Sequence, residues 1–191
     1  MIQNKKYEAI VIGTSIGGLH AISTLLEEIP ANYPLPIIIV QHRSKTPRDL
    51  LEEILQIKTK VKVKQADEKE EIENGVVYIA PPDYHLLIEN NKTFSLTVDE
   101  LDSFSRPSIN VLFESAASVY KEKLIGIILT GANNDGSQGV QAIYKNNGLV
   151  IVQDPDEAKC CIMPIAAINT KAVNHILTLP KIQKFLLKIT D

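Results

Sequence analysis

Short apolar runs alternate along this chain with longer stretches in which apolar residues recur at every third or fourth position. The short runs are rich in Ile and Val, and they predict buried strands over residues 8–13, 36–41, 61–64, 76–80, 124–130 and 149–153. The periodic stretches predict helices over residues 18–29, 47–55, 108–121, 137–146 and 164–172, with Ser108 as an N-cap. Strands that alternate with helices are typical of βαβ units, so we expect a mainly parallel sheet.

One segment departs from this alternation. Residues 85–88 and 93–98 flank a turn-forming sequence at 89–92, which predicts an antiparallel hairpin at one edge of the sheet. The run at 124–130 is the most hydrophobic and is expected to be central, and the run at 149–153 is expected to be the last strand. We therefore predict one α/β domain over residues 1–191, a doubly wound three-layer α/β/α fold.

Composition excludes several classes of protein. The chain is 45% hydrophobic and 23% charged, close to the average of globular domains. A net charge of −3 provides no overall basic field for nucleic acid or an anionic membrane. The start has no signal-peptide pattern, and the apolar runs are far shorter than the roughly 20 residues of a membrane helix. Cys160 and Cys161 are adjacent and provide neither a disulfide framework nor a metal-ligand spacing, so we expect a cytoplasmic protein.

Three polar side chains follow predicted strands and are candidates for one site. Ser15 lies in the sequence after the first strand, His42 follows the second, and Asp135 lies in the loop after residues 124–130. In open α/β sheets, ligands bind beyond the carboxyl ends of the strands. These residues are therefore expected to share a site as nucleophile, general base and orienting carboxylate.

The turn around Ser15 reads Gly13-Thr14-Ser15-Ile16-Gly17 and fits G-x-S-x-G between a strand and a helix. This pattern presents a serine hydroxyl at a sharp turn and brings amides of the helix start near a developing oxyanion.

A phosphate-binding turn is the alternative for this segment, because Gly13, Ser15 and Gly18 nearly fit G-x-G-x-x-G. The middle glycine is missing, and strand two ends without the acidic residue that a dinucleotide site requires. No Gly-Lys-Ser/Thr sequence follows either, so we expect no nucleotide cofactor.

The histidines and Asp135 also have purely structural interpretations. His42 alone could be a hydrogen-bonded structural residue, and Asp135 could form an Asx-turn. His20, His85 and His175 are weaker candidates, and no histidine pair has the helical spacing of a zinc site, so no metal is expected.

The chain resembles the catalytic domain of CheB-type chemotaxis methylesterases over about residues 9–182. The motifs that carry the resemblance are GTSIGG at 13–18, VQH at 40–42, VYIAP at 77–81 with His85, RPSINVLFESA at 106–116, LTGANNDG at 129–136, QD at 153–154 and MP at 163–164.

The resemblance implies a Ser15–His42–Asp135 triad, with the backbone N–H groups of Ile16 and Ala132 as oxyanion donors. It also implies hydrolysis of glutamyl methyl esters on chemoreceptor helices, with release of methanol, and deamidation of receptor glutamines. Family members usually carry an N-terminal receiver domain. Few residues precede the first predicted strand, so we expect no receiver domain in residues 1–191; either the protein is a stand-alone esterase or the chain is a fragment. Nothing in the sequence indicates the oligomeric state.

Several positions depart from the family pattern. Ile16 replaces a common threonine, Arg43-Ser44 replaces Met-Pro, Ala132-Asn133 replaces Met-Gly, and Ile162 replaces a glycine. Two alternatives therefore stay open: a non-catalytic module that binds a receptor or partner in the altered cleft, and a serine esterase for another ester.

Overall fold

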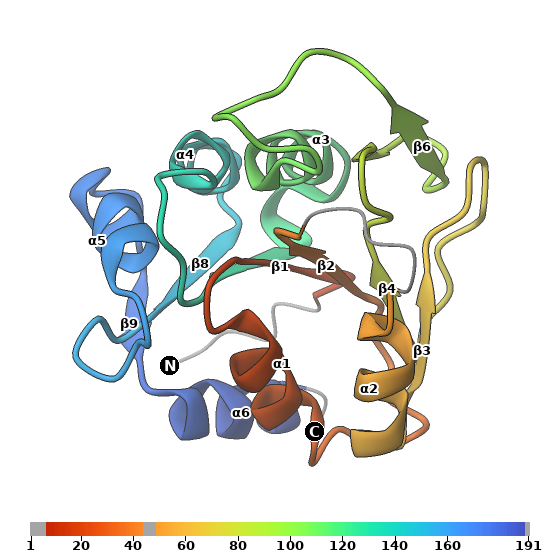
Figure 1. The fold of residues 1–191 in the computed structure, drawn as a ribbon, viewed down its shortest axis with the longest axis horizontal. Helices are drawn as coiled ribbons and strands as arrows, with labels where there is room; N and C mark the ends of the chain where they lie inside the picture. The colour runs from red at the N-terminus through yellow and green to blue at the C-terminus, as the bar shows by residue number, and fades with distance from the viewer. Residues whose placement is uncertain (1–6, 44–48, 190–191) are drawn as a thin grey trace.

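A seven-stranded parallel sheet forms the centre of the molecule (Figure 1), in a computed structural model that describes residues 7–43 and 49–189. The strand order is β3-β4-β2-β1-β7-β8-β9. The strands are β1 (Ala9–Thr14), β2 (Ile37–Gln41), β3 (Lys62–Gln65), β4 (Val76–Ile79), β7 (Leu124–Ile128), β8 (Leu149–Gln153) and β9 (His175–Leu177). Because all pairings in this sheet are parallel, the carboxyl ends of its strands lie along one edge.

Helices cover both faces of the sheet. The helices are α1 (Gly18–Leu26), α2 (Leu51–Lys58), α3 (Ile109–Tyr120), α4 (Ser137–Lys145), α5 (Ile162–Asn169) and α6 (Leu179–Lys188). Alternate residues of β1 divide the core: Val11 packs with α3, α4 and α5, whereas Ile10 and Ile12 pack with α1, α2 and α6. Figure 1 shows the two helical layers on opposite sides of the strands. The predicted three-layer fold is confirmed.

The predicted elements are largely present, with shifted ends. Helix α1 ends at Leu26, three residues before the predicted end. Helix α2 begins at Leu51 and continues to Lys58, and the start of the prediction, at 47–48, lies outside the described residues. Ser108 caps α3 as predicted, because its side chain accepts a hydrogen bond from the N–H of Val111.

Two elements near the C-terminus, β9 and α6, were not predicted. Strand β9 follows β8 at the sheet edge, so 149–153 is not the last strand. Strand β9 has only three residues, and His175 and Ile176 are exposed, so no apolar alternation marks it. Strand β7 lies inside the sheet beside β1, which is the middle strand.

The predicted antiparallel hairpin exists as β5 (His85–Ile88) and β6 (Phe94–Thr97). Within the described residues it forms a separate two-stranded sheet and does not add to the edge of the large one. Its apolar residues Leu86, Ile88 and Phe94 pack into the same core as α3, which explains why the pair lies beside that helix. No helix in the described part of the chain is long and apolar enough to cross a membrane.

Candidate active site

Ser15 lies in a tight turn between β1 and α1. Its N–H donates to the carbonyl of Thr130 at 3.0 Å, and its carbonyl accepts the N–H of Gly18 at 3.0 Å. The amide Nε2 of Gln41 donates to the same carbonyl at 2.9 Å. The main chain of Ser15 is therefore held from three sides, and its side chain is half-buried at the end of the strand.

Two glycines permit this turn. Gly17 has a φ of 86°, in the left-handed region that favours glycine. Gly13 lies against the start of α3, where a Cβ atom would overlap the side chain of Ile109. In the G-x-S-x-G pattern, the second glycine is therefore required by its backbone conformation, and the first by the close approach of α3.

His42 follows β2 and lies beside the Ser15 turn. Its N–H donates to the carbonyl of Thr14 at 3.0 Å, which continues the β1–β2 pairing by one residue. Its Nε2 contacts Oδ2 of Asp135 at 2.7 Å, and its side chain is 11% exposed. The structure thus brings together two of the three predicted triad residues, from strands that are not neighbours in the sequence.

The carboxylate of Asp135 is fully buried and accepts hydrogen bonds on both oxygens. The N–H of Ile109 donates to Oδ2 at 2.7 Å, the N–H of Asn110 donates to Oδ1 at 3.0 Å, and Ser108 Oγ lies 3.1 Å from Oδ1. These amides are the first of α3, where the helix dipole favours a negative charge. Asp135 is therefore held in place as a hydrogen-bond acceptor that faces His42. Its carboxylate has more partners than the purely structural Asx-turn considered from the sequence would provide.

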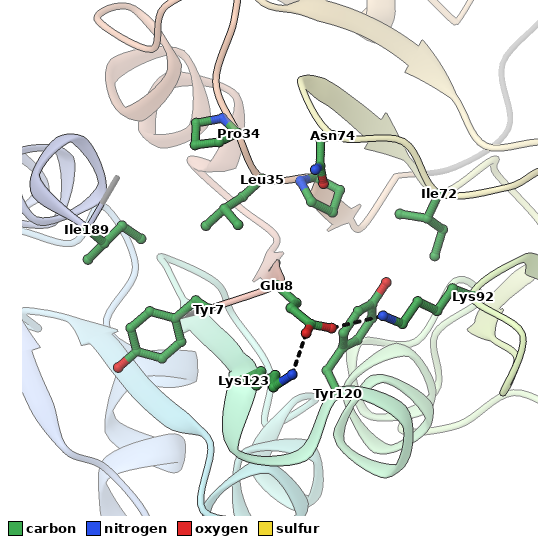
Figure 2. Close-up of a pocket in the computed structure, with 11 residues that line it drawn as sticks. Tyr7, Glu8, Pro34, Leu35, Ile72, Asn74, Lys92, Tyr120, Lys123 and Ile189 are labelled. Atoms are coloured by element: carbon green, nitrogen blue, oxygen red, sulfur yellow. Dashed lines mark hydrogen bonds and ion pairs between the residues drawn. The ribbon is translucent and has the colours of Figure 1, made fainter. Parts of the chain in front are cut away.

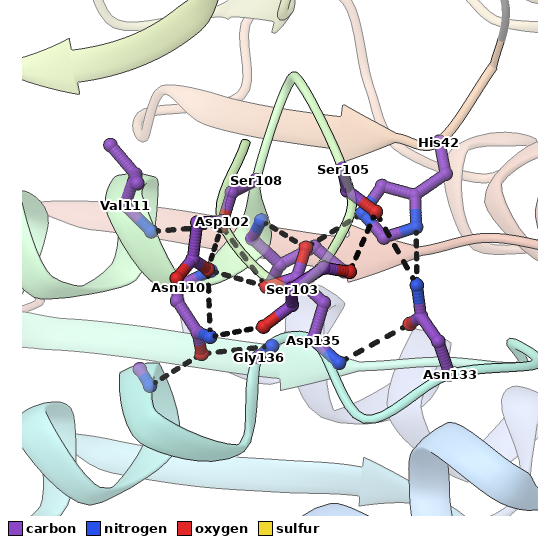
Figure 3. A network of polar contacts seen from close by, with 12 residues as sticks. His42, Asp102, Ser103, Ser105, Ser108, Asn110, Val111, Asn133, Asp135 and Gly136 are labelled. Atoms are coloured by element: carbon purple, nitrogen blue, oxygen red, sulfur yellow. Dashed lines mark hydrogen bonds and ion pairs between the residues drawn. The ribbon is translucent and has the colours of Figure 1, made fainter. Parts of the chain in front are cut away.

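A polar network extends from Asp135 to a second carboxylate (Figure 3). Ser108 Oγ lies 2.7 Å from Oδ2 of Asp102, and Nδ2 of Asn110 donates to the same oxygen at 3.0 Å. Oδ1 of Asn110 accepts the N–H groups of Gly136, Gln138 and Gly139 at the start of α4. One asparagine therefore connects the N-termini of the helices on either side of Asp135.

The second ring nitrogen of His42 contacts Asn133. Nδ2 of Asn133 lies 3.4 Å from Nδ1 of His42, as Figure 3 shows. Among the described residues, no hydrogen bond connects Ser15 Oγ with the imidazole. Of the two side-chain contacts of a catalytic triad, this conformation therefore contains the one between His42 and Asp135.

The two predicted oxyanion donors lie at the ends of β1 and β7. Ile16 and Ala132 are both exposed, and neither N–H donates to another described residue. The carbonyl of Ile16 accepts from Thr130 Oγ1 at 2.8 Å, which ties this segment to the end of β7. Both amides are therefore available to a ligand.

Two cavities border the candidate triad. One of about 570 Å³ is lined by His42 and by residues 101 and 104–107, among others. Another, of about 470 Å³, is lined by Ser15, His20, Lys58 and Lys159, among others. The candidate base and the candidate nucleophile thus each line a cavity.

Arg43 has several contacts within the protein. Its Nε pairs with Asp49 at 2.9 Å, and its two terminal nitrogens donate to the carbonyls of Gln41 and Ala80. The guanidinium therefore joins the ends of β2 and β4, a structural role that the sequence did not indicate.

Of the remaining histidines, His20 lines the cavity beside Ser15, and none of the three forms a hydrogen bond or ion pair with the candidate triad among the described residues. His85 is buried, with Nε2 at 3.0 Å from the carbonyl of Glu100 and Nδ1 accepting the N–H of Ser108. His20 is exposed, and His175 lies near Phe185 with ring centroids 6.5 Å apart. Among residues 7–43 and 49–189, no group of three or more His, Cys, Asp or Glu side chains could hold a metal.

A cavity of about 700 Å³ lies at the opposite, amino-terminal ends of the strands (Figure 2). Glu8 bridges Lys92 and Lys123 there, at 2.8 and 2.5 Å. Both lysines are thus paired within the protein, and no residue of the candidate triad lines this cavity.

Sequence reasoning missed four side chains that build the site: Gln41, Ser108, Asn110 and Asn133. Each was visible in a motif, and Ser108 was recognised only as a helix cap. A buried glutamine at the end of an apolar strand was the clearest available signal, since such a side chain needs polar partners.

Comparison with known proteins gives a consistent result. The family model described as CheB methylesterase matches residues 10–186. A Leptospira interrogans protein named "Putative protein-glutamate methylesterase/protein-glutamine glutaminase" is 50% identical over 183 residues, covering 96% of this chain and 95% of that protein. A "Protein-glutamate methylesterase/protein-glutamine glutaminase 2" of Methanosarcina mazei is 36% identical, and this chain spans 51% of its length.

The fold agrees with these matches. The crystal structure of the Thermotoga maritima CheB methylesterase catalytic domain superposes with a TM-score of 0.91 and 32% sequence identity. The superposition covers 96% of this chain and 99% of that domain. The structure pairs the buried Asp135 with His42 next to the Ser15 turn. Together with the family match, the relatives and the shared fold, this shows that the chain belongs to the CheB methylesterase family.

Proposed function

We propose that this protein hydrolyses glutamyl methyl esters on chemoreceptor helices, releasing methanol, with Ser15 as nucleophile, His42 as general base and Asp135 as its orienting partner. The same site would deamidate receptor glutamines and release ammonia. The proposal is supported by the names of the relatives and, above all, by the contact between Nε2 of His42 and the buried Asp135.

In this proposal, the contact with Asp135 gives each ring nitrogen of His42 a separate role. Asp135 accepts on both oxygens, so in the neutral imidazole the proton lies on Nε2 and the lone pair on Nδ1. Nδ1 is then the base that takes the Ser15 proton, because the charged imidazolium that forms is stabilised by Asp135.

The reaction proceeds by acyl transfer. Ser15 Oγ attacks the ester carbonyl, and the N–H groups of Ile16 and Ala132 stabilise the oxyanion. His42 returns the proton to the departing methanol, and a water molecule activated by Nδ1 then releases the glutamate. The two cysteines are free, as in a reducing compartment, so we place the reaction in the cytoplasm.

Methanol release from methylated chemoreceptor membranes tests the proposal. We expect release by the wild-type protein and a loss on the order of 10⁶-fold for Ser15→Ala, as for other triads. Membranes that another methylesterase demethylates serve as the positive control. Wild-type release no greater than that of the variant would reject this activity, and a serine-directed fluorophosphonate would then separate another esterase from a binding module.

A further inference from the structure

Asn133 is held in one orientation by its own contacts. Its Oδ1 accepts the N–H of Asp135 at 3.2 Å, which identifies the oxygen end of the amide. Its Nδ2 therefore faces Nδ1 of His42 and Ser105 Oγ, each at 3.4 Å (Figure 3). Every polar atom of the amide has a partner in the candidate site.

The contact with His42 uses the atom that the proposed reaction needs. Because Asp135 takes the proton-bearing Nε2, Nδ1 has a lone pair and accepts a hydrogen bond from Asn133. A lone pair that already accepts a hydrogen bond is not available to the hydroxyl of Ser15. In the described part of the chain, Nδ1 has the contact with Asn133 and no hydrogen bond from Ser15 Oγ.

We propose that Asn133 is a positioning residue that occupies the base nitrogen of His42 in the free protein and must release it before Ser15 can transfer its proton. This inference rests on the proposed function, because it assigns the base role to Nδ1. In the acylation step the proton moves from Ser15 Oγ to Nδ1, and the Asn133 amide keeps its own hydrogens. Asn133 thus slows the attack by Ser15 until a substrate separates it from His42.

The substitution Asn133→Ser tests this role. A serine at this position keeps an oxygen for the Asp135 N–H and removes the amide Nδ2, which is the donor to His42; its shorter side chain ends one atom before the position of that nitrogen. We expect labelling of Ser15 by a fluorophosphonate to become roughly 2- to 10-fold faster, the change that corresponds to one neutral hydrogen bond. The KM for methylated receptor membranes should fall by a similar factor, because the substrate no longer has to break the contact between Asn133 and His42 when it binds. Asn134→Ser is the matched control, because Asn134 is exposed in the same loop and its side chain makes no hydrogen bond to a described residue.

The ¹⁵N chemical shift of Nδ1 in the neutral imidazole provides a readout that a merely structural role would not move. It should increase in Asn133→Ser, because the nitrogen loses its hydrogen bond, and stay at the wild-type value in Asn134→Ser. Asn133→Asp should act in the opposite direction on labelling. Its carboxylate would keep the bond to the Asp135 N–H and favour the imidazolium, which cannot accept a proton.

The outcomes separate the two proposals. Wild-type protein that neither releases methanol nor reacts with the fluorophosphonate would reject the proposed function, and the Nδ1 shift would then decide the Asn133 contact alone. An unchanged labelling rate or an unchanged Nδ1 shift in Asn133→Ser would overturn the role of Asn133. If circular dichroism shows that the serine variant is unfolded, slower labelling in Asn133→Asp supports the proposal, and wild-type labelling contradicts it.

Discussion

The side-chain amide of Gln41 donates to the carbonyl of Ser15 at 2.9 Å, and this residue also holds His42. The same Nε2 donates to the carbonyl of His42 at 2.9 Å, so one buried amide connects the two turns that carry the proposed nucleophile and base. Gln41 is 8% exposed and lies at the end of β2, between these turns. The relative position of Ser15 and His42 therefore depends on a residue that takes no part in the chemistry.

Replacing Gln41 with leucine should damage activity through geometry. The variant loses both hydrogen bonds, and a displacement of about 1 Å between reacting groups can cost roughly 10²-fold in rate. We expect kcat/KM for methanol release to fall by about that factor while the KM changes little. Gln138→Leu, at an exposed glutamine of α4, is the control. A loss of activity no larger in Gln41→Leu than in Gln138→Leu would show that the backbone holds the two turns without this amide.

Replacing Ser108 with alanine should destabilise the start of α3. Ser108 Oγ accepts the N–H of Val111 and contacts both Asp102 and Asp135. Loss of an N-cap costs about 1 kcal/mol in the free energy of unfolding, which urea denaturation measures. Ser137→Ala is the matched variant, because Ser137 Oγ is buried and has no hydrogen-bond partner among the described residues. It should be neutral or stabilising, and equal destabilisation by both variants would contradict the capping role.

The ion pairs of Glu8 predict a pH dependence of stability. Hydrogen bonds from Lys123 and then from Lys92 lower the pKa of Glu8 below its usual range. A lowered pKa in the folded state stabilises the fold above the pKa of the unfolded chain, about 4.3, and this contribution is lost as the pH falls through the folded value. Glu8→Gln should therefore lower the free energy of unfolding at pH 7 and have progressively less effect as the pH falls below 4.

Glu122→Gln is the control for this prediction. Glu122 also acts on Lys123, but only as the last and smallest cause of its raised pKa, and it has no ion pair with a described residue. Urea denaturation of both variants at pH 7 and at low pH measures the effect. An equal loss of stability at both pH values in Glu8→Gln would mean that packing, rather than charge, accounts for the role of Glu8.

Most of the fold was predictable because the apolar periodicity is strong. Strand β8 has the predicted bounds, β1, β2 and β7 deviate by a residue or two, and the βαβ alternation predicted the parallel sheet. Helix α6 was not predicted, although Leu179, Ile182 and Leu186 have helical spacing and are buried. Strand β9 had no such signal. The separation of the β5–β6 hairpin from the sheet depends on its packing against α3, which is a tertiary effect.

The sequence by itself determined which residue types follow the strands, and so it determined the candidate triad. In a parallel sheet, the residues that follow each strand lie at the same edge. Ser15, His42 and Asp135 follow β1, β2 and β7, which are adjacent in the sheet. Only the tertiary structure decided how these groups are oriented. His42 and Asp135 are 93 residues apart in the sequence. Which ring nitrogen of His42 faces the carboxylate depends on Asp135 at Nε2 and on Asn133 at Nδ1. Spacing along the chain carries no information about such contacts, because they depend on the packing of α3 and α4 against the ends of β1 and β7.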